Sequence, residues 1–160
     1  MFRILFWLLV FALVVLAWLV WGLYRRALFA RRVARARQDF ESNRAVLEQQ
    51  FCAAAQATGK PRGLSWKQCD FHGPLILARD RANGQLVGLI GVTISFEAVE
   101  GGGMEDVAAV GNLRAASAVL EWNRQEWTSH GRAVFNLEPR EVLDRYGDNL
   151  ELVSIEQITI

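Results

Sequence analysis

An uncharged apolar run of 21 residues, Ile4–Tyr24, constrains this chain more than any other feature of its sequence. At about 1.5 Å rise per residue, a helix of that length crosses a hydrocarbon core of about 30 Å. Aromatic residues lie near both ends, with Trp7 at one and Trp18 and Trp21 at the other, as is typical of membrane interfaces. A cleaved signal peptide is the alternative, but its apolar core is only about 7–15 residues long and ends at a small-residue cleavage site. We therefore expect residues 4–24 to cross a lipid bilayer as an uncleaved anchor.

Arginines follow the apolar run. Six of them lie between Arg25 and Arg37, whereas the other flank holds only Arg3 and the amino terminus. The positive-inside rule then predicts a single-pass protein of the cell (inner) membrane, with its N-terminus outside and its C-terminal domain in the cytoplasm. The same Arg25–Arg37 stretch can attract anionic lipid headgroups, at about 1 kcal/mol per basic residue. The sequence leaves open whether these arginines bind lipid or act only as a topology signal.

Charge divides the chain in the same place. Residues 1–37 carry seven arginines and no acid, whereas residues 38–160 carry 11 basic and 17 acidic side chains. An acidic domain repels phosphate groups, so we expect no nucleic-acid partner. The two cysteines, Cys52 and Cys69, form no Cys-x-x-Cys pair and have no histidine companion at metal-binding spacing. We expect two reduced, partly buried thiols.

The predicted organisation is an anchor over residues 1–24, a basic juxtamembrane stalk over 25–37 and a cytoplasmic domain over 38–160. Residues 25–58 contain neither Pro nor Gly, so the membrane helix is expected to continue into the domain and to end within "TGKPRG" at 58–63. Near-helical spacing gives this helix a narrow apolar face that we expect to lie on the core, made of Phe40, Leu47, Phe51 and Ala54. Arg37 and Arg44 interrupt the spacing that a coiled coil requires.

Strand-like alternation replaces helical spacing after residue 63. "PLILARD" (74–80) and "QLVGLIGVTISFEAV" (85–99) flank Asn83-Gly84, a favoured tight-turn pair, and predict a hairpin. The later expected elements are a strand at 106–122 bulged at Gly111-Asn112, a strand at 130–137, a short helix at 138–147 and a last strand at 150–160. This order predicts an α+β fold in which a transmembrane helix continues into a stalk helix that packs on a curved antiparallel β-meander.

Two parts of the chain resemble known folds or families. The element order of residues 38–160 is similar to that of cystatin-like and nuclear-transport-factor-like folds. The segment "IGVTISFEAVEGGGMEDVAAVGNLRAA" (90–116) resembles a family of uncharacterised bacterial proteins with one amino-terminal anchor. That second resemblance implies a membrane anchor and no site residues, because no activity is assigned to the family.

The glycine run at 101–103 lies among four acids, Glu97, Glu100, Glu105 and Asp106. Phosphate binding is disfavoured, because no Lys-Ser/Thr pair follows the glycines and the acids repel an anion. The acids in this loop, 97–106, can hold Ca²⁺ or Mg²⁺, but their spacing matches no calcium loop. We favour a solvated turn whose glycines adopt positive φ.

"CDFH" (69–72) brings a thiol, a carboxylate and an imidazole together. Alternation puts Asp70 and His72 on one face and Cys69 on the other, so an acid and a base share a face without a nucleophile. His130 lies in a turn and receives no role. Three tryptophans are expected to cap the core, although one can line a pocket between helix and sheet: Trp66, Trp122 and Trp127.

The sequence therefore predicts a membrane-anchored, non-enzymatic interaction or scaffold protein whose cytoplasmic domain binds another protein. The alternative is a small-ligand-binding or enzymatic domain, with a pocket between helix and sheet and Asp70, His72 or the acidic loop at its mouth. We assign no catalytic, cofactor-binding or metal-binding residue and expect no cofactor. A well-packed sheet interior favours the first interpretation, and a polar-lined cavity favours the second.

Overall fold

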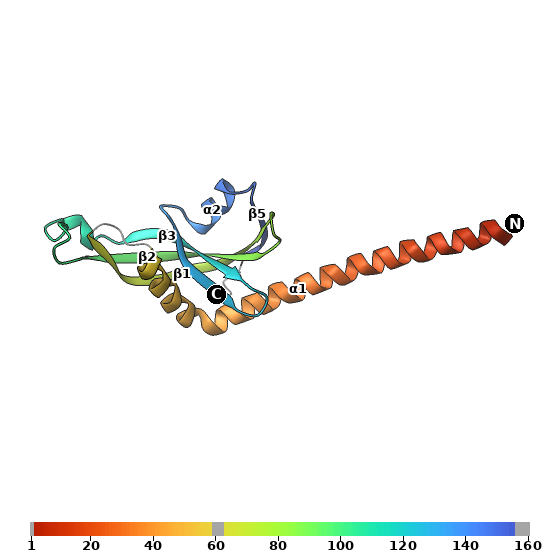
Figure 1. Ribbon diagram of the computed structural model, residues 1–160, viewed down its shortest axis with the longest axis horizontal. Coiled ribbons are helices and arrows are strands. Elements are labelled where there is room, and N and C mark those ends of the chain that lie inside the picture. Colours follow the sequence, from red (N-terminus) through yellow and green to blue (C-terminus); the bar gives the residue numbers. More distant parts are fainter. Residues whose placement is uncertain (1, 59–62, 156–160) are drawn as a thin grey trace. The chain divides into compact units, whose positions relative to one another are not determined.

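The computed structural model of the chain describes residues 2–58 and 63–155. It divides into two compact units, Met1–Arg35 and Ala36–Ile160. The long helix α1 (Phe2–Thr58) contributes to both units. The second unit also holds, in chain order, β1 (Leu64–Asp80), β2 (Leu86–Ala98), the 3-10 helix η1 (Ala108–Gly111), β3 (Arg114–Trp122), β4 (Trp127–Phe135), α2 (Pro139–Arg145) and β5 (Leu150–Ile155) (Figure 1).

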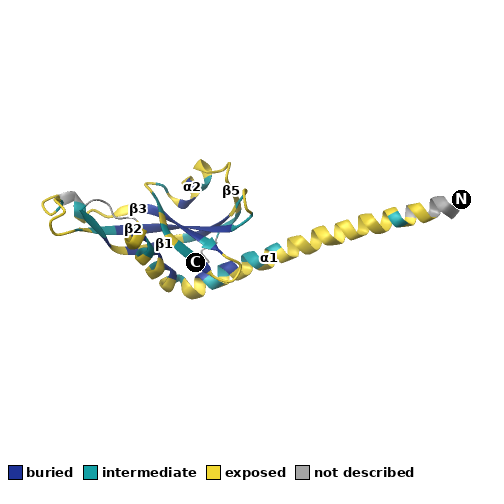
Figure 2. Cartoon of the chain, in the orientation of Figure 1, coloured by how far each residue is buried: buried dark blue, intermediate teal, exposed yellow. Residues whose placement is uncertain are grey.

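The first unit is helical, and most of its described residues are exposed (Figure 2). Trp7, Phe11 and Trp18 each expose more than 60% of their surface. The most apolar window of α1 has a mean hydropathy of 1.6 and contains no buried residue. The amino-terminal part of α1 is thus long and apolar enough to cross a membrane.

The second unit is built on an antiparallel sheet in the strand order β4-β3-β2-β1-β5. Strands β1 to β4 form a meander, and β5 returns to the other side of β1. A register shift between His72 and Ile76 interrupts β1, at Gly73 with φ +70°. The part of β1 beyond this shift pairs with β2 on one side and with β5 on the other. The α+β fold class, with a long helix followed by a curled antiparallel sheet, is confirmed.

The carboxyl-terminal part of α1 packs on one face of this sheet. Phe51 contacts the rings of Trp66 and Phe71, with centroids 6.4 and 5.6 Å away, and Phe40 contacts Trp127 at 6.3 Å. The helix buries Ala36, Phe40, Leu47, Phe51 and Ala55, so three of the four expected positions are confirmed and Ala55 replaces Ala54. Helix α2 lies on the opposite face of the sheet (Figure 1).

Polar side chains of α1 follow the edge of β1 that β5 does not cover. Arg44 Nη2 donates to the carbonyl oxygen of Phe71 at 3.1 Å, and Glu48 Oε2 accepts from the backbone N–H of Phe71 at 2.6 Å. One turn beyond Cys52, Gln56 Nε2 donates to the carbonyl oxygen of Trp66 at 2.8 Å. Arg44, Glu48, Cys52 and Gln56 follow one another at intervals of four residues, so one stripe of the helix faces the strand edge. The stripe satisfies backbone groups that a bare edge offers to other strands.

Several expected boundaries were wrong. Strand β1 begins at Leu64, ten residues before the expected start, because the sequence break at Gly73-Pro74 is a bulge within one strand. The expected strand at 106–122 is strand only from Arg114; a loop and η1 precede it, and Gly111 ends η1 instead of forming a bulge. Strand β4 begins at Trp127 and ends at Phe135, rather than spanning 130–137. The expected residues 156–160 of the last strand and most of "TGKPRG" lie outside the described residues.

Candidate functional site

A cleft of about 430 Å³ lies on the sheet face that carries α2. Its floor is apolar, because β2, β3 and β4 present valine and leucine side chains there. Val142 of α2 is buried against the same side chains and limits the cleft on one side. The apolar lining residues are Val87, Leu89, Val119, Val134, Val142 and Leu150.

The cleft exists because α2 is too short to cover the sheet. The helix has seven residues, and only Pro139 and Val142 are buried in it. Its position is fixed at its start: the buried Ser117 hydroxyl donates to the carbonyl oxygen of Leu137 at 2.6 Å. The N–H of Glu138 also donates to the Glu141 carboxylate at 2.8 Å, which caps the first turn. A firmly held but short helix therefore leaves Val134 and Leu150 half-buried beside it, whereas Val87, Leu89 and Val119 are buried.

Polar groups surround the apolar floor. Glu121 of β3 lies 3.4 Å from the Arg132 guanidinium of β4 and 3.9 Å from the His130 imidazole. At the end near the β1–β2 turn, the N–H of Arg81 donates to the carbonyl oxygen of Asn149 at 2.8 Å, which joins that turn to the segment after α2. The polar lining residues are Asp80, Asn83, Gln85, Glu121, Arg132, Tyr146 and Asn149. The cleft thus combines an apolar centre with a polar rim that carries charges of both signs.

A smaller pocket of about 190 Å³ lies at the start of α2 and includes His72, Pro139 and Arg140. Asp70 pairs with Thr93 and His72 with Gly91, so both side chains lie on the α2 face, as alternation predicted. The His72 ring lies over Gly91, where a Cβ would come within 2.6 Å of its Cε1 atom. Of the groups expected at a pocket mouth, only His72 lies at one, because Asp70 and the acidic loop are absent from the described lining of both pockets.

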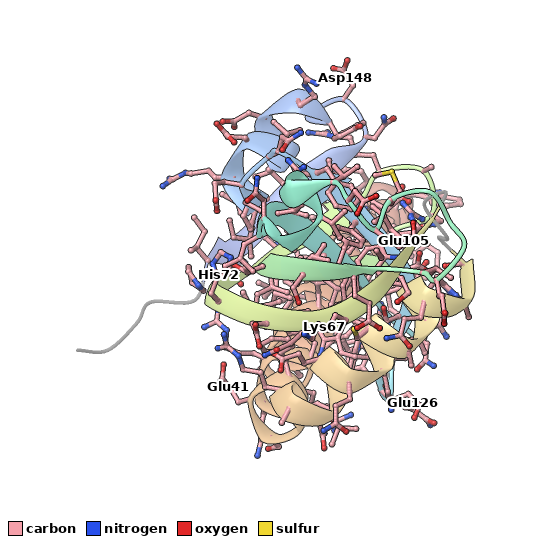
Figure 3. All side chains as sticks on the ribbon, turned by 90° about the vertical axis from the view of Figure 1, so that its left-hand side faces the viewer. Glu41, Lys67, His72, Glu105, Glu126 and Asp148 are labelled. Carbon is pink, nitrogen blue, oxygen red and sulfur yellow. The ribbon has the colours of Figure 1, made fainter. Side chains whose placement is uncertain are left out.

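The acidic glycine loop is a turn whose backbone is held by its own carboxylate. Gly101 and Gly103 have φ of +77° and +72°, as expected for a glycine turn, whereas Gly102 is not among the glycines with positive φ. The Glu105 carboxylate accepts a hydrogen bond from the N–H of Gly101. Hydrogen bonds from backbone N–H groups, led by that of Glu105 itself and then that of Gly101, lower the pKa of this carboxyl group. Glu105 lies well apart from His72 on the domain (Figure 3).

The described part of the chain contains no cluster of metal-binding side chains. Within residues 2–58 and 63–155, no three His, Cys, Asp or Glu side chains gather as ligands. Glu97 accepts a hydrogen bond from the Ser65 hydroxyl at 3.0 Å. Of the four acids, Glu97 therefore bonds to β1 and Glu105 bonds within the loop.

The three tryptophans of the second unit lie in its core. Trp66, Trp122 and Trp127 expose 6%, 3% and 3% of their surface, and the described lining of the two pockets contains none of them. Their rings contact one another and Phe96, with Trp66–Phe96 centroids 5.1 Å apart and Trp122–Trp127 centroids 5.3 Å apart. Trp127 Nε1 donates to the carbonyl oxygen of Ala36 in α1 at 2.8 Å. The expectation that they cap the core is confirmed.

Sequence reasoning missed the main cleft. Two pairs of its lining residues can be recognised in the sequence. Arg132 and Val134 are two positions apart on one strand, and Val142 and Tyr146 are one helical turn apart. Their shared location depends on how far α2 extends over the sheet, which no local pattern encodes.

Comparison with known proteins found no match to this chain among family models, curated proteins or solved structures. The resemblance of residues 90–116 to a bacterial anchored family stays a prediction, as does the likeness in element order to cystatin-like folds. The geometry of the cleft and the apolar anchor helix are therefore the basis on which a function is proposed.

Proposed function

We propose that this chain is a membrane-anchored, non-enzymatic binding protein whose C-terminal domain holds a partner protein in the cleft beside α2. The observation that carries this proposal is the composition of the cleft, an apolar floor on which Val134 and Leu150 are half-buried, surrounded by polar groups. Protein interfaces have the same arrangement, with an apolar centre and a solvated polar rim. Partner side chains can fill the valine-lined floor while the rim bonds the partner backbone.

The residue types at the rim favour a protein partner. Tyr146 exposes 42% of its surface, and Arg132 reaches the same rim from β4. Tyrosine and arginine are enriched among residues that contribute most of the energy of protein binding. The opposite face of the sheet supports the same interpretation, since α1 fills it with a closed aromatic core.

A small-molecule ligand is the second candidate, favoured by one observation. The volume of about 430 Å³ falls in the range of small-molecule sites, about 300–1,000 Å³. An apolar body on the floor with a polar group at the Glu121–Arg132 pair would match the lining. Enzymatic activity would require reacting groups at this cleft, and the Asp70–His72 pair lies outside its described lining.

Affinity purification of the full chain from gently solubilised membranes tests the proposal. Val134→Glu places a charge on the cleft floor, and Leu152→Glu places the same charge on an exposed site outside the described lining. We expect Val134→Glu to lower the recovery of a specific partner at least about 30-fold, the effect of losing an interface hot spot. Leu152→Glu should leave recovery unchanged.

Equal recovery with both variants would refute the cleft as the binding site. Native mass spectrometry of the purified chain separates the two candidates. A bound small molecule that is released by Val134→Glu, in a chain that recovers no protein partner, would replace the first candidate with the second.

Membrane placement is part of the same proposal. We propose that α1 spans the cell (inner) membrane once, with its N-terminus outside and the C-terminal domain in the cytoplasm. Support comes from the exposed apolar helix and from the arginine excess on its carboxyl-terminal flank. A reporter that fluoresces only in the cytoplasm, fused after Ile160, should be bright. If the fusion is expressed but does not fluoresce, the orientation is the opposite of the one proposed.

We also propose that arginines of the Arg25–Arg37 stretch bind anionic lipid headgroups. Arg37 contributes least, because its Nη2 donates to the Ser154 hydroxyl at 2.9 Å. Exchanging Arg31 and Arg35, which are exposed, for Gln should reduce the number of anionic phospholipids that the chain retains in native mass spectrometry. Unchanged retention would leave these arginines with a topological role alone.

A further inference from the structure

The two cysteines of the chain meet across the contact between α1 and β1. Cys52 Sγ and Cys69 Sγ are 2.6 Å apart, although 16 residues separate them in sequence. This separation approaches the S–S bond length of about 2.05 Å. Both are free thiols; Cys69 is buried and Cys52 is half-buried, so one of the pair can be reached from solvent. The sequence contains no further cysteine to compete for either.

The thiols are held in place by neighbours on both sides. Before Cys52, Glu48 accepts the N–H of Phe71; after it, Gln56 donates to the carbonyl oxygen of Trp66. Helix and strand are therefore fixed on either side of the sulfur atoms by bonds that do not involve sulfur. Reacting groups positioned in this way reach high effective concentrations, since the entropy of bringing them together is lost on folding.

From this geometry we propose that Cys52 and Cys69 form a reversible intramolecular disulfide that locks α1 to β1. The oxidant is a low-molecular-weight disulfide. The Cys52 thiolate attacks one of its sulfur atoms, which forms a mixed disulfide and releases one thiolate. The Cys69 thiolate then attacks the Cys52 sulfur and releases the second. In the balanced exchange, two protein thiols become one disulfide, and the oxidant is reduced to two thiols that take up the two protons.

The environment makes this lock slow to close at neutral pH. Burial, followed by the hydrogen bond and charge of Cys52, raises the pKa of the Cys69 thiol far above its ordinary value; Asp70 and Glu48 act in the same direction. The thiolate is the reacting species, so few molecules react at any moment. The closing step, in which the Cys69 thiolate attacks, should therefore speed up as the pH rises across the neutral and mildly alkaline range.

The experiment uses the full chain in detergent, in redox buffers of reduced and oxidised glutathione, followed by acid quenching, thiol alkylation and mass spectrometry. We expect the folded chain to form the intramolecular disulfide at a lower ratio of oxidised to reduced glutathione than the chain in denaturant, by at least about tenfold. The oxidised chain should also melt about 10 °C higher. Cys52→Ser serves as a control that can form only a mixed disulfide.

Three results would overturn the proposal. The first is a folded chain whose thiols both stay free at ratios that oxidise the denatured chain. The second is a disulfide that links two chains, seen as a dimer without reductant. The third is an oxidised chain that melts at or below the temperature of the reduced one, because a lock that fits the native fold must stabilise it.

Discussion

The two faces of the sheet differ in how they are covered. The α1 face carries Phe40, Leu47 and Phe51 against the aromatic side chains of β1 and β4, and these helix residues expose at most 3% of their surface. The α2 face is covered by a seven-residue helix with one deeply buried aliphatic side chain, Val142, and a cleft remains beside it. The same strands supply both faces, because alternate side chains point to opposite sides.

This difference separates stability from binding. A closed aromatic core contributes the stabilisation of the fold, since apolar burial contributes about 25 cal/mol for each Å² removed from water. The α2 face leaves Val134 and Leu150 half-buried at the cleft, where the proposed partner would contact them. Substitutions on the α1 face should therefore act mainly on unfolding, and substitutions at the cleft mainly on binding.

The largest expected effect is that of Gly131→Ala. Gly131 has φ of +67°, and a Cβ there would collide with the backbone of Ala54 and Ala55 in α1. We expect a loss of about 3–5 kcal/mol in the free energy of unfolding, from overpacking added to backbone strain. Urea unfolding followed by tryptophan fluorescence measures it.

Gly101→Ala is the matched control, because Gly101 also has positive φ, +77°, but no atom within 4 Å of the added Cβ. It should lose only about 1 kcal/mol, from strain alone. Equal losses for the two variants would show that β4 does not press against α1.

Phe51→Ala should be the next largest, with a loss of about 2–5 kcal/mol, because a fully buried aromatic side chain leaves a cavity. Leu47→Ala should fall in the same range. Val142→Ala on the α2 face removes fewer carbon atoms and should lose about 1–2 kcal/mol. The comparison breaks down if Val142→Ala destabilises the chain more than Phe51→Ala does in the same unfolding assay.

Two tryptophans sharpen the contrast within the α1 face. Trp127→Phe removes the donor to the Ala36 carbonyl and part of a buried ring, and should lose about 1–3 kcal/mol, although the Ala36 carbonyl keeps its bond to the N–H of Phe40 within the helix. Trp122 Nε1 is buried without an acceptor among the described residues, so Trp122→Phe removes an unpaired donor. It should lose less than Trp127→Phe by thermal denaturation. The reverse order would mean that the bond to α1 contributes little.

The smallest expected effect lies outside both faces, in the acidic glycine loop. The folded pKa of Glu105 is lowered, so its contribution to stability is present above its ordinary pKa of 4.5 and is lost as the pH falls through the folded value. Glu105→Gln should therefore make the melting temperature fall less steeply as the pH is lowered from about 5. The expected differences are small and are measured by calorimetry. Glu100→Gln is the control and should keep the wild-type slope.

The sequence predicted the elements that depend on local pattern. The apolar spacing of Phe40, Leu47 and Phe51 defined the buried side of α1, because a helix turns by a constant angle per residue. Alternation likewise placed Asp70 and His72 together on one face. The glycine turn was recognisable for the same reason, since glycine adopts positive φ more readily than residues with a Cβ.

The rest depends on contacts between distant segments. The start of β1 was missed because Gly73-Pro74 is typical of a break, whereas pairing with β2 continues on both sides of it. Ala55 rather than Ala54 is buried because Gly131 of β4 packs against that turn of α1. The meeting of Cys52 with Cys69 depends on the stripe of polar residues that aligns α1 with the edge of β1. None of these pairings leaves a pattern within one segment.

The bond from Trp127 to Ala36 has a consequence for how the chain is made. The two residues are 91 positions apart, and ribosomes add about 5–20 residues each second. The apolar side of α1 ends at Ala55, 72 positions before Trp127, so it is complete for roughly 4–14 s before β4 begins to form. During that time the part of α1 that β4 covers stays uncovered, and folding of the domain can finish only after β4 has left the ribosome.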